Sequence, residues 1–119
     1  MDKGIIYKDK KVKILLADFP ITKGHTIVIW NDAVKDLKIL DKKDYDYLMD
    51  KVDETRNALI KTLKVKKVYL VYMDELKHVH WHLIPRYKKT GFSVFRNKPK
   101  KINDYSLAQK IKKNLVLKI

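Results

Sequence analysis

The chain has 119 residues, of which 45% are hydrophobic, and this length and composition suit one globular domain with a single core. It contains no cysteine, which excludes disulfides, thiolate metal sites and a cysteine nucleophile. No apolar run approaches the roughly 18 residues that cross a bilayer. The first residues also lack the apolar centre of a signal peptide, so we expect a cytoplasmic protein without a membrane segment.

The formal net charge of +14 is compatible with a polyanionic partner such as nucleic acid. However, only three of the 28 basic residues are arginine, whose planar fork suits specific recognition of phosphates and bases. An excess of lysine beside abundant Ile, Asp and Tyr can equally reflect a genome of biased base composition. The charge alone therefore leaves a nucleic-acid partner open.

Up to residue 40 the sequence predicts three strands and a short helix. Residues 5–7 and 12–17 flank a lysine-rich turn and form a hairpin-like start, which breaks before Pro20 because proline lacks an N–H group. Residues 25–30 are β-branched and apolar, as in a buried strand. A short helical piece is expected over residues 33–40.

The longest predicted helix spans residues 41–64, with Asp41 as its N-cap. Its apolar residues recur at spacings of three and four, which places them on one face. These residues are Leu48, Val52, Thr55, Leu59, Thr62 and Leu63.

The second half of the chain adds two strands and a helical tail. Residues 65–73 and 78–85 are predicted strands, and Pro85 is expected to close the second. Residues 87–99 are expected to be irregular and 105–115 helical. The anchors expected in the irregular segment are Phe92, Val94 and Phe95.

Consecutive strands with one long helix between them are typical of an α+β fold, here with an antiparallel sheet of about five strands. No repeat or linker divides the chain, so residues 1–119 are expected to form one domain. The open edges of such a short sheet favour pairing with a second copy, which predicts a homodimer with an extended sheet.

Three of the four histidines, His78, His80 and His82, stand at every second position of one predicted strand. Successive side chains of a strand point to opposite faces, so the three imidazoles would share one face. Val79 and Trp81 would then point into the core. Adjacent imidazoles can donate, accept, attack or ligate near neutral pH.

Three uses compete for this row of imidazoles. One is a metal site, although the outer two histidines lie roughly 13 Å apart along a strand, so a further ligand would be required. Another is nucleophilic attack on phosphorus by one imidazole, with its neighbours binding phosphoryl oxygens or protonating a leaving group. The third is surface histidines without a role. Candidates for the further metal ligand are His25, Asp18, Asp74 and Glu75.

The run His-Val-His-Trp-His-Leu-Ile over residues 78–84 resembles the His-x-His-x-His signature of the histidine triad (HIT) family. The continuation Pro-Arg-Tyr over residues 85–87 is similar to one branch of that family. The run Gly-His-Thr-Ile-Val-Ile over residues 24–29 resembles the Gly-His strand that family members carry upstream. The resemblance covers roughly residues 5–115 and implies a HIT-like fold and a homodimer.

Carried over by position, the resemblance implies that His80 is the nucleophile on the α-phosphorus of a nucleotide. His82 would contact phosphate and assist the leaving group or the water, His78 would order the cluster, and His25 would lie behind it. Asp18 would bind the ribose. The walls of the base pocket would include Leu16 and Phe19.

The implied activity is that of a nucleotidyl hydrolase or transferase that cleaves a nucleotide P–N or P–O–P bond through a nucleotidyl-histidine intermediate. Its substrate would be a nucleoside phosphoramidate, an adenylated amine or a dinucleoside polyphosphate, and neither a metal nor another cofactor would be needed.

The alternative is a nucleotide-binding or nucleic-acid-binding module with weak or no catalysis, or action on adenylated nucleic acid ends. The carboxylates of Asp74 and Glu75, just before the triad, disfavour phosphate nearby and motivate this alternative. A second motivation is the lysine-rich tail, for which a solvated helix face is the simpler interpretation. The tail lysines are Lys98, Lys100, Lys101, Lys110, Lys112 and Lys113.

Overall fold

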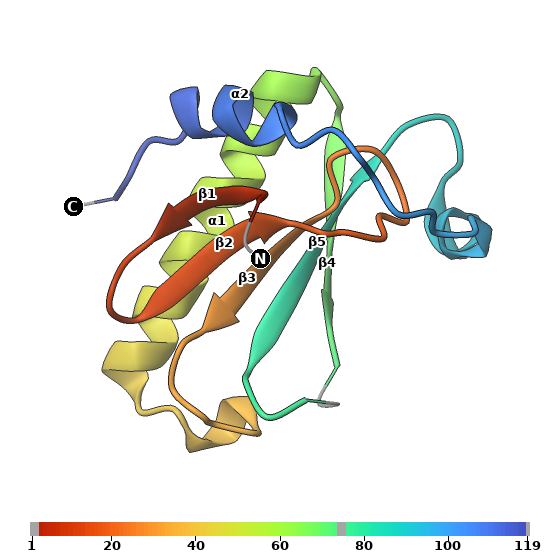
Figure 1. The fold of residues 1–119 in the computed structure, drawn as a ribbon. Helices are drawn as coiled ribbons and strands as arrows, with labels where there is room; N and C mark the ends of the chain where they lie inside the picture. The colour runs from red at the N-terminus through yellow and green to blue at the C-terminus, as the bar shows by residue number, and fades with distance from the viewer. Residues whose placement is uncertain (1–2, 74–75, 119) are drawn as a thin grey trace.

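The computed structural model describes residues 3–73 and 76–118. Five strands form one antiparallel sheet in the order β1-β2-β3-β5-β4 (Figure 1). The strands are β1 (Ile5–Lys8), β2 (Val12–Leu16), β3 (Thr26–Trp30), β4 (Lys67–Tyr72) and β5 (His80–Arg86). The predicted α+β fold with five strands is confirmed. None of the helices in the described part of the chain is long and apolar enough to cross a membrane.

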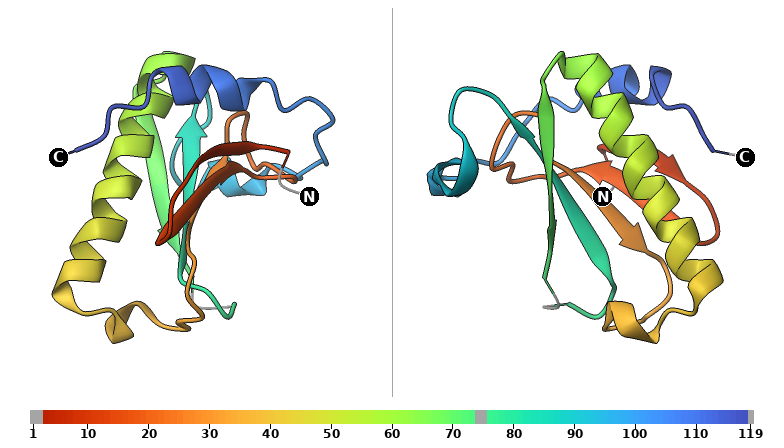
Figure 2. Two further views of the ribbon diagram at one scale, coloured as in Figure 1. Left: turned by 60° about the vertical axis from the view of Figure 1, so that its left-hand side comes forward. Right: turned by 180° about the vertical axis from the view of Figure 1, so that it is seen from behind.

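One long helix, α1 (Lys42–Leu63), packs across one face of the sheet, against β3, β4 and β5 (Figure 2). The helix begins where the side chain of Asp41 accepts a hydrogen bond of 2.9 Å from the backbone N–H of Asp44. It ends at Lys64, which adopts a left-handed conformation with φ of 56°. The predicted helix over 41–64 thus differs from the observed one by a residue at each end. The smaller helix α2 (Leu107–Lys113) packs against α1 and β1.

The two faces of the sheet differ because side chains alternate along each strand. In β3, Thr26, Val28 and Trp30 are buried on the side of α1, whereas Ile27 and Ile29 point to the opposite face. β2 repeats this pattern, with Val12, Ile14 and Leu16 buried. The sheet therefore has one face covered by the core and one face free to form a site.

The helix predicted over residues 33–40 is mostly wrong: only Leu37–Ile39 form a single 3₁₀ turn, η1. The side chain of Asp36 accepts a hydrogen bond from the backbone N–H of Lys38, so this turn begins at Leu37. Leu40 is already extended, with ψ of 133°, ahead of the cap of α1. Because Asp36 caps the start of η1 and Asp41 already caps the start of α1, the segment between them holds a single turn.

The segment predicted as irregular, residues 87–99, contains a 3₁₀ helix, η2 (Gly91–Arg96). Of its three expected anchors, Val94 is buried, Phe95 is partly exposed and stacks on Tyr69, and Phe92 is 90% exposed. Phe92 is therefore not an anchor.

The strand expected to close at Pro85 continues to Arg86. The pairing of β3 with β5 ends at Leu83, so Pro85 pairs only with Val68 of β4. A proline is tolerated at that position because its missing N–H faces no partner strand.

Candidate functional site

The three histidines of the predicted triad lie together on the sheet face away from α1. His80 and His82 lie opposite Ile29 and Ile27 of β3, and His78 lies two residues before the start of β5. All three line a cavity of about 430 Å³. The other residues that line it are Lys13, Ile27, Ile29, Asn31 and Leu76.

His80 is held with a defined proton position. Its Nδ1 lies 3.0 Å from the backbone carbonyl oxygen of His78, and only 7% of the residue is exposed. A carbonyl oxygen can only accept, so the proton of the neutral ring is on Nδ1 and Nε2 keeps a free lone pair. This is the tautomer that a nucleophilic imidazole requires.

His78 is oriented in the same way from the neighbouring strand. Its Nδ1 lies 3.0 Å from the carbonyl oxygen of Trp30, the last residue of β3. Its Nδ1 therefore carries a proton, and the side chain is tied to β3 across the end of the cavity. This contact also holds the chain that leads into β5.

His25 connects a loop to the triad. The backbone N–H of Ile21 donates to Nδ1 of His25 at 3.0 Å, and Nε2 of His25 lies 2.9 Å from Nδ1 of His82. An amide N–H can only donate, so neutral His25 carries its proton on Nε2 and donates it to His82. His82 therefore carries its own proton on Nε2. His80 and His82, with ring centroids 5.0 Å apart, thus offer opposite groups: a lone pair and an N–H donor.

The loop before His25 depends on Gly24. Its φ of 87° is rarely adopted by other residues, and an added Cβ would lie 2.6 Å from Cδ1 of Leu63. Gly24 thus permits the close turn between Ile21 and His25 on which the hydrogen bond depends.

Burial keeps both histidines of this pair neutral. It lowers the pKa of His25 to about 4, with a further contribution from the nearby charge of His82. Burial also lowers the pKa of His82, together with the charge of His80. Protonation of His25 would place a proton on Nδ1, against the N–H of Ile21, so the hydrogen-bonded pair requires neutral rings.

Acidification should therefore destabilise the protein through His25. Since the pKa of His25 is lower in the folded state than the unfolded value near 6.5, the unfolded chain binds more protons between pH 6.5 and 4, and stability falls as the pH falls. A shift of this size corresponds to about 3 kcal/mol, fully lost only near pH 4. Urea unfolding at several pH values should show this loss. The variant His25→Asn, which keeps an acceptor for Ile21 but does not titrate, should show a smaller loss; an identical loss would contradict the assignment.

The predicted nucleotide-binding residues occupy different surroundings. Asp18 is exposed, and its Oδ1 accepts a hydrogen bond of 2.5 Å from the hydroxyl of Tyr105. Phe19 is 58% exposed beside it. Leu16 is 3% exposed and belongs to the core, so its side chain lies on the face of α1 and borders a different hollow, with His25. Leu15, which pairs with Ile27, is on the triad face instead.

Sequence reasoning missed two residues near this site. Lys13 lines the triad cavity and adds a cation there; its alternation with Val12 and Ile14 along β2 was the available signal. Tyr105 meets Asp18 across 87 residues of chain, and no sequence signal indicated that contact. The carboxylates of Asp74 and Glu75, expected to disfavour phosphate, lie outside the described residues.

A metal site is one of the three uses that the sequence allows for the triad. The described residues include no group of three or more His, Asp or Glu side chains that could hold a metal ion. The Nδ1 atoms of all three triad histidines are engaged in hydrogen bonds, which leaves their Nε2 atoms for chemistry at the cavity.

Comparison with known proteins agrees with the fold and the motif. Residues 1–89 match the HIT domain. An uncharacterized HIT-like protein of Mesomycoplasma hyorhinis is 33% identical over 91 residues, which cover 71% of this chain and 82% of the relative.

Solved structures give the same fold. A HIT-like protein involved in cell-cycle regulation from Bartonella henselae superposes with a TM-score of 0.79 at 22% identity, over 94% of this chain and 86% of that one. A hypothetical histidine triad nucleotide-binding protein from Sulfolobus tokodaii gives 0.77 at 23% identity, over 94% and 83%. With its triad, its sheet order and a domain match over residues 1–89, the chain belongs to the HIT family.

Proposed function

We propose that the protein is a nucleotidyl hydrolase or transferase that cleaves a nucleotide P–N or P–O–P bond through a covalent nucleotidyl-His80 intermediate. The observation that carries the proposal is the hydrogen bond between His80 Nδ1 and the carbonyl of His78, which leaves Nε2 as an unprotonated nucleophile beside the cavity. Membership of the HIT family, which includes nucleotide hydrolases and transferases, supports the same class.

In the first step, Nε2 of His80 attacks the α-phosphorus and forms a P–N bond. The bond from phosphorus to the leaving group breaks, and the leaving group departs with the electron pair and takes up a proton from water. The His80 ring becomes cationic, and its Nδ1–H bond to the His78 carbonyl stabilises that charge. The Nε2–H group of His82 donates a hydrogen bond to the phosphate or the leaving group and stabilises the negative charge that develops there.

In the second step, water or another acceptor attacks the phosphorus and the P–N bond to His80 breaks. The electron pair returns to Nε2, and the nucleotide is released with loss of a proton from the attacking water.

Asp18 is proposed to bind the ribose, with one carboxylate oxygen oriented by Tyr105 and the other available to a hydroxyl. Lys13 would add a positive charge beside the phosphates.

The test is intact-protein mass spectrometry after brief incubation with adenosine and guanosine phosphoramidates and dinucleoside polyphosphates. We expect a transient mass increase of one nucleotidyl group, together with free mononucleotide. The base that gives the adduct would define the substrate class. The absence of both the adduct and free mononucleotide across the whole panel would contradict the proposal.

We also propose that the protein forms a homodimer through the edge of its sheet. β4 is one of the two edge strands and carries Leu70, which is 40% exposed, with Met73, 50% exposed, just beyond its end. An unpaired edge with apolar side chains favours association. Sedimentation equilibrium should give about twice the chain mass of 14.2 kDa. Leu70→Glu should shift the mass toward the monomer; a wild type that is monomeric at every concentration would contradict the dimer.

A further inference from the structure

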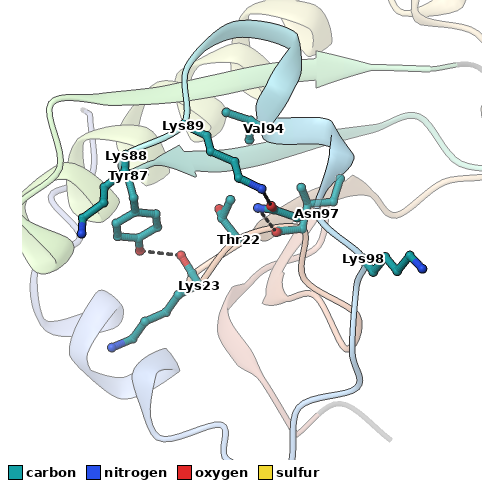
Figure 3. Close-up of a pocket in the computed structure, with 9 residues that line it drawn as sticks. Thr22, Lys23, Tyr87, Lys88, Lys89, Val94, Asn97 and Lys98 are labelled. Atoms are coloured by element: carbon teal, nitrogen blue, oxygen red, sulfur yellow. Dashed lines mark hydrogen bonds between the residues drawn. The ribbon is translucent and has the colours of Figure 1, made fainter.

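Another hollow lies away from the triad, and it is larger than the triad cavity. It has a volume of about 700 Å³ and lies between the loop around Thr22 and the segment that follows β5 (Figure 3). Four of its nine lining residues are lysines, and none is acidic. The lining residues are Ile21, Thr22, Lys23, Tyr87, Lys88, Lys89, Val94, Asn97 and Lys98.

The side chains of Tyr87 and Lys89 in this hollow are engaged in hydrogen bonds, whereas three other lysines at its rim extend outward. The hydroxyl of Tyr87 donates to the carbonyl of Lys23 at 2.6 Å, and the amino group of Lys89 donates to Oδ1 of Asn97 at 2.8 Å. Figure 3 shows the side chains of Lys23 and Lys88 extending to one side of the hollow and that of Lys98 to the other. In the described part of the chain, no carboxylate pairs with any of these three.

The positive charge continues beyond this hollow. An adjoining hollow of about 460 Å³ shares Tyr87 and Lys88 with it and adds Lys64, Lys66 and Arg86, again without an acidic residue. We call the exposed lysines of the two hollows the lysine band, which comprises Lys23, Lys64, Lys66, Lys88, Lys89 and Lys98.

Exposed aromatic side chains accompany the lysine band. Tyr87, shared by both hollows, is 42% exposed. Phe92 is 90% exposed and lies in η2, the same short helix whose Val94 lines the larger hollow. A phenylalanine this exposed contributes little to the fold, but its ring is available for a nucleobase to stack on.

We propose that the lysine band and Phe92 bind single-stranded nucleic acid without sequence preference. Amino groups on opposite sides of the hollow suit successive phosphates of a chain better than one compact anion, toward which donors would converge. Lysines act as point charges and lack the planar fork that reads base edges, which predicts contacts to the backbone. The site uses none of the triad residues and does not depend on the proposed catalytic function.

The experiment is fluorescence anisotropy with a labelled 20-nucleotide oligothymidine at 50 to 200 mM NaCl. Wild type should bind, with log Kd rising linearly with log salt concentration. The triple variant Lys23→Gln/Lys88→Gln/Lys98→Gln should weaken binding at 50 mM by about tenfold or more. It should also reduce the salt slope by about 2, at roughly 0.7 per phosphate contact.

The matched control is Lys35→Gln/Lys38→Gln/Lys43→Gln, which removes the same charge from exposed lysines. These lie at or just before the N-terminal end of α1, whereas Lys64 of the lysine band follows its C-terminal end (Figure 1). It should leave Kd within about twofold. Phe92→Ala should weaken binding several-fold with an unchanged salt slope, because stacking carries no charge. His80→Ala should bind like wild type, so failure of catalysis and failure of this site are distinguishable.

Four outcomes would overturn the proposal. They are no binding at 50 mM NaCl, equal weakening by the two triple variants, equal affinity for a duplex of the same length, and displacement of the oligonucleotide by tripolyphosphate at equal phosphate concentration. Equal weakening by the two triple variants would mean a general effect of net charge. Displacement by tripolyphosphate would mean a site for a compact anion. Circular dichroism melts of each variant establish that it is folded.

Discussion

Replacing His80 by alanine should lower kcat/KM by about 10⁴-fold or more, because the variant loses the atom that forms the covalent bond. The nucleotidyl adduct seen by mass spectrometry should disappear with it. The fold should persist, since the side chain borders a cavity and its hydrogen-bond partner, the carbonyl of His78, can bond to water instead. Steady-state kinetics and circular dichroism on the same preparation measure both effects.

A matched variant separates chemistry from structure. His80→Gly leaves space in which added imidazole can take the place of the missing ring, so turnover should recover in part as imidazole is added. The wild type should show no such gain. Full activity of His80→Ala without imidazole would exclude His80 as the nucleophile, and the covalent mechanism with it.

Replacing Glu54 by alanine should destabilise the fold by about 3–5 kcal/mol, because it leaves the ammonium of Lys51 buried and unpaired. The amino group of Lys51 lies 3.0 Å from Oε1 of Glu54, and the two side chains are only 5% and 1% exposed. The rings of Tyr7 and Tyr47, each centred 5.1 Å from the ammonium, complete its surroundings. Urea unfolding at neutral pH measures the change.

Two controls test whether the unpaired charge is the cause. The double variant Lys51→Met/Glu54→Leu removes both charges at similar volume and should recover most of the loss. Asp46→Ala breaks the exposed pair with Lys42 on the same helix and should change stability far less, since solvent screens that pair. If Glu54→Ala unfolds at the same urea concentration as wild type, the buried pair is not a determinant of stability.

The parts of the fold that were predictable are those specified by neighbouring residues. The cap at Asp41 and the apolar stripe through Leu48, Val52 and Leu59 define α1 to within a residue at each end. The alternation of His78, His80 and His82 correctly indicates a shared face, since strand geometry has period two.

The parts that were not predictable depend on residues distant in sequence. The family resemblance places Leu16 at the base pocket, whereas the structure buries it in the core, on the same face of β2 as Val12 and Ile14. The bond between His25 and His82 spans 57 residues and depends on the alignment of β3 with β5. Only three-dimensional pairing defines that alignment.

The hydrogen bond from Ile21 to His25 has a consequence for which residues can vary. The donor is a main-chain N–H, which every amino acid except proline supplies. The side chain at position 21 can therefore change freely as far as the imidazole tautomers are concerned. The position of the proton on His82 is therefore set by the backbone at Ile21, through two successive hydrogen bonds. Among the residues between Pro20 and Gly24, this requires only a backbone N–H donor at position 21.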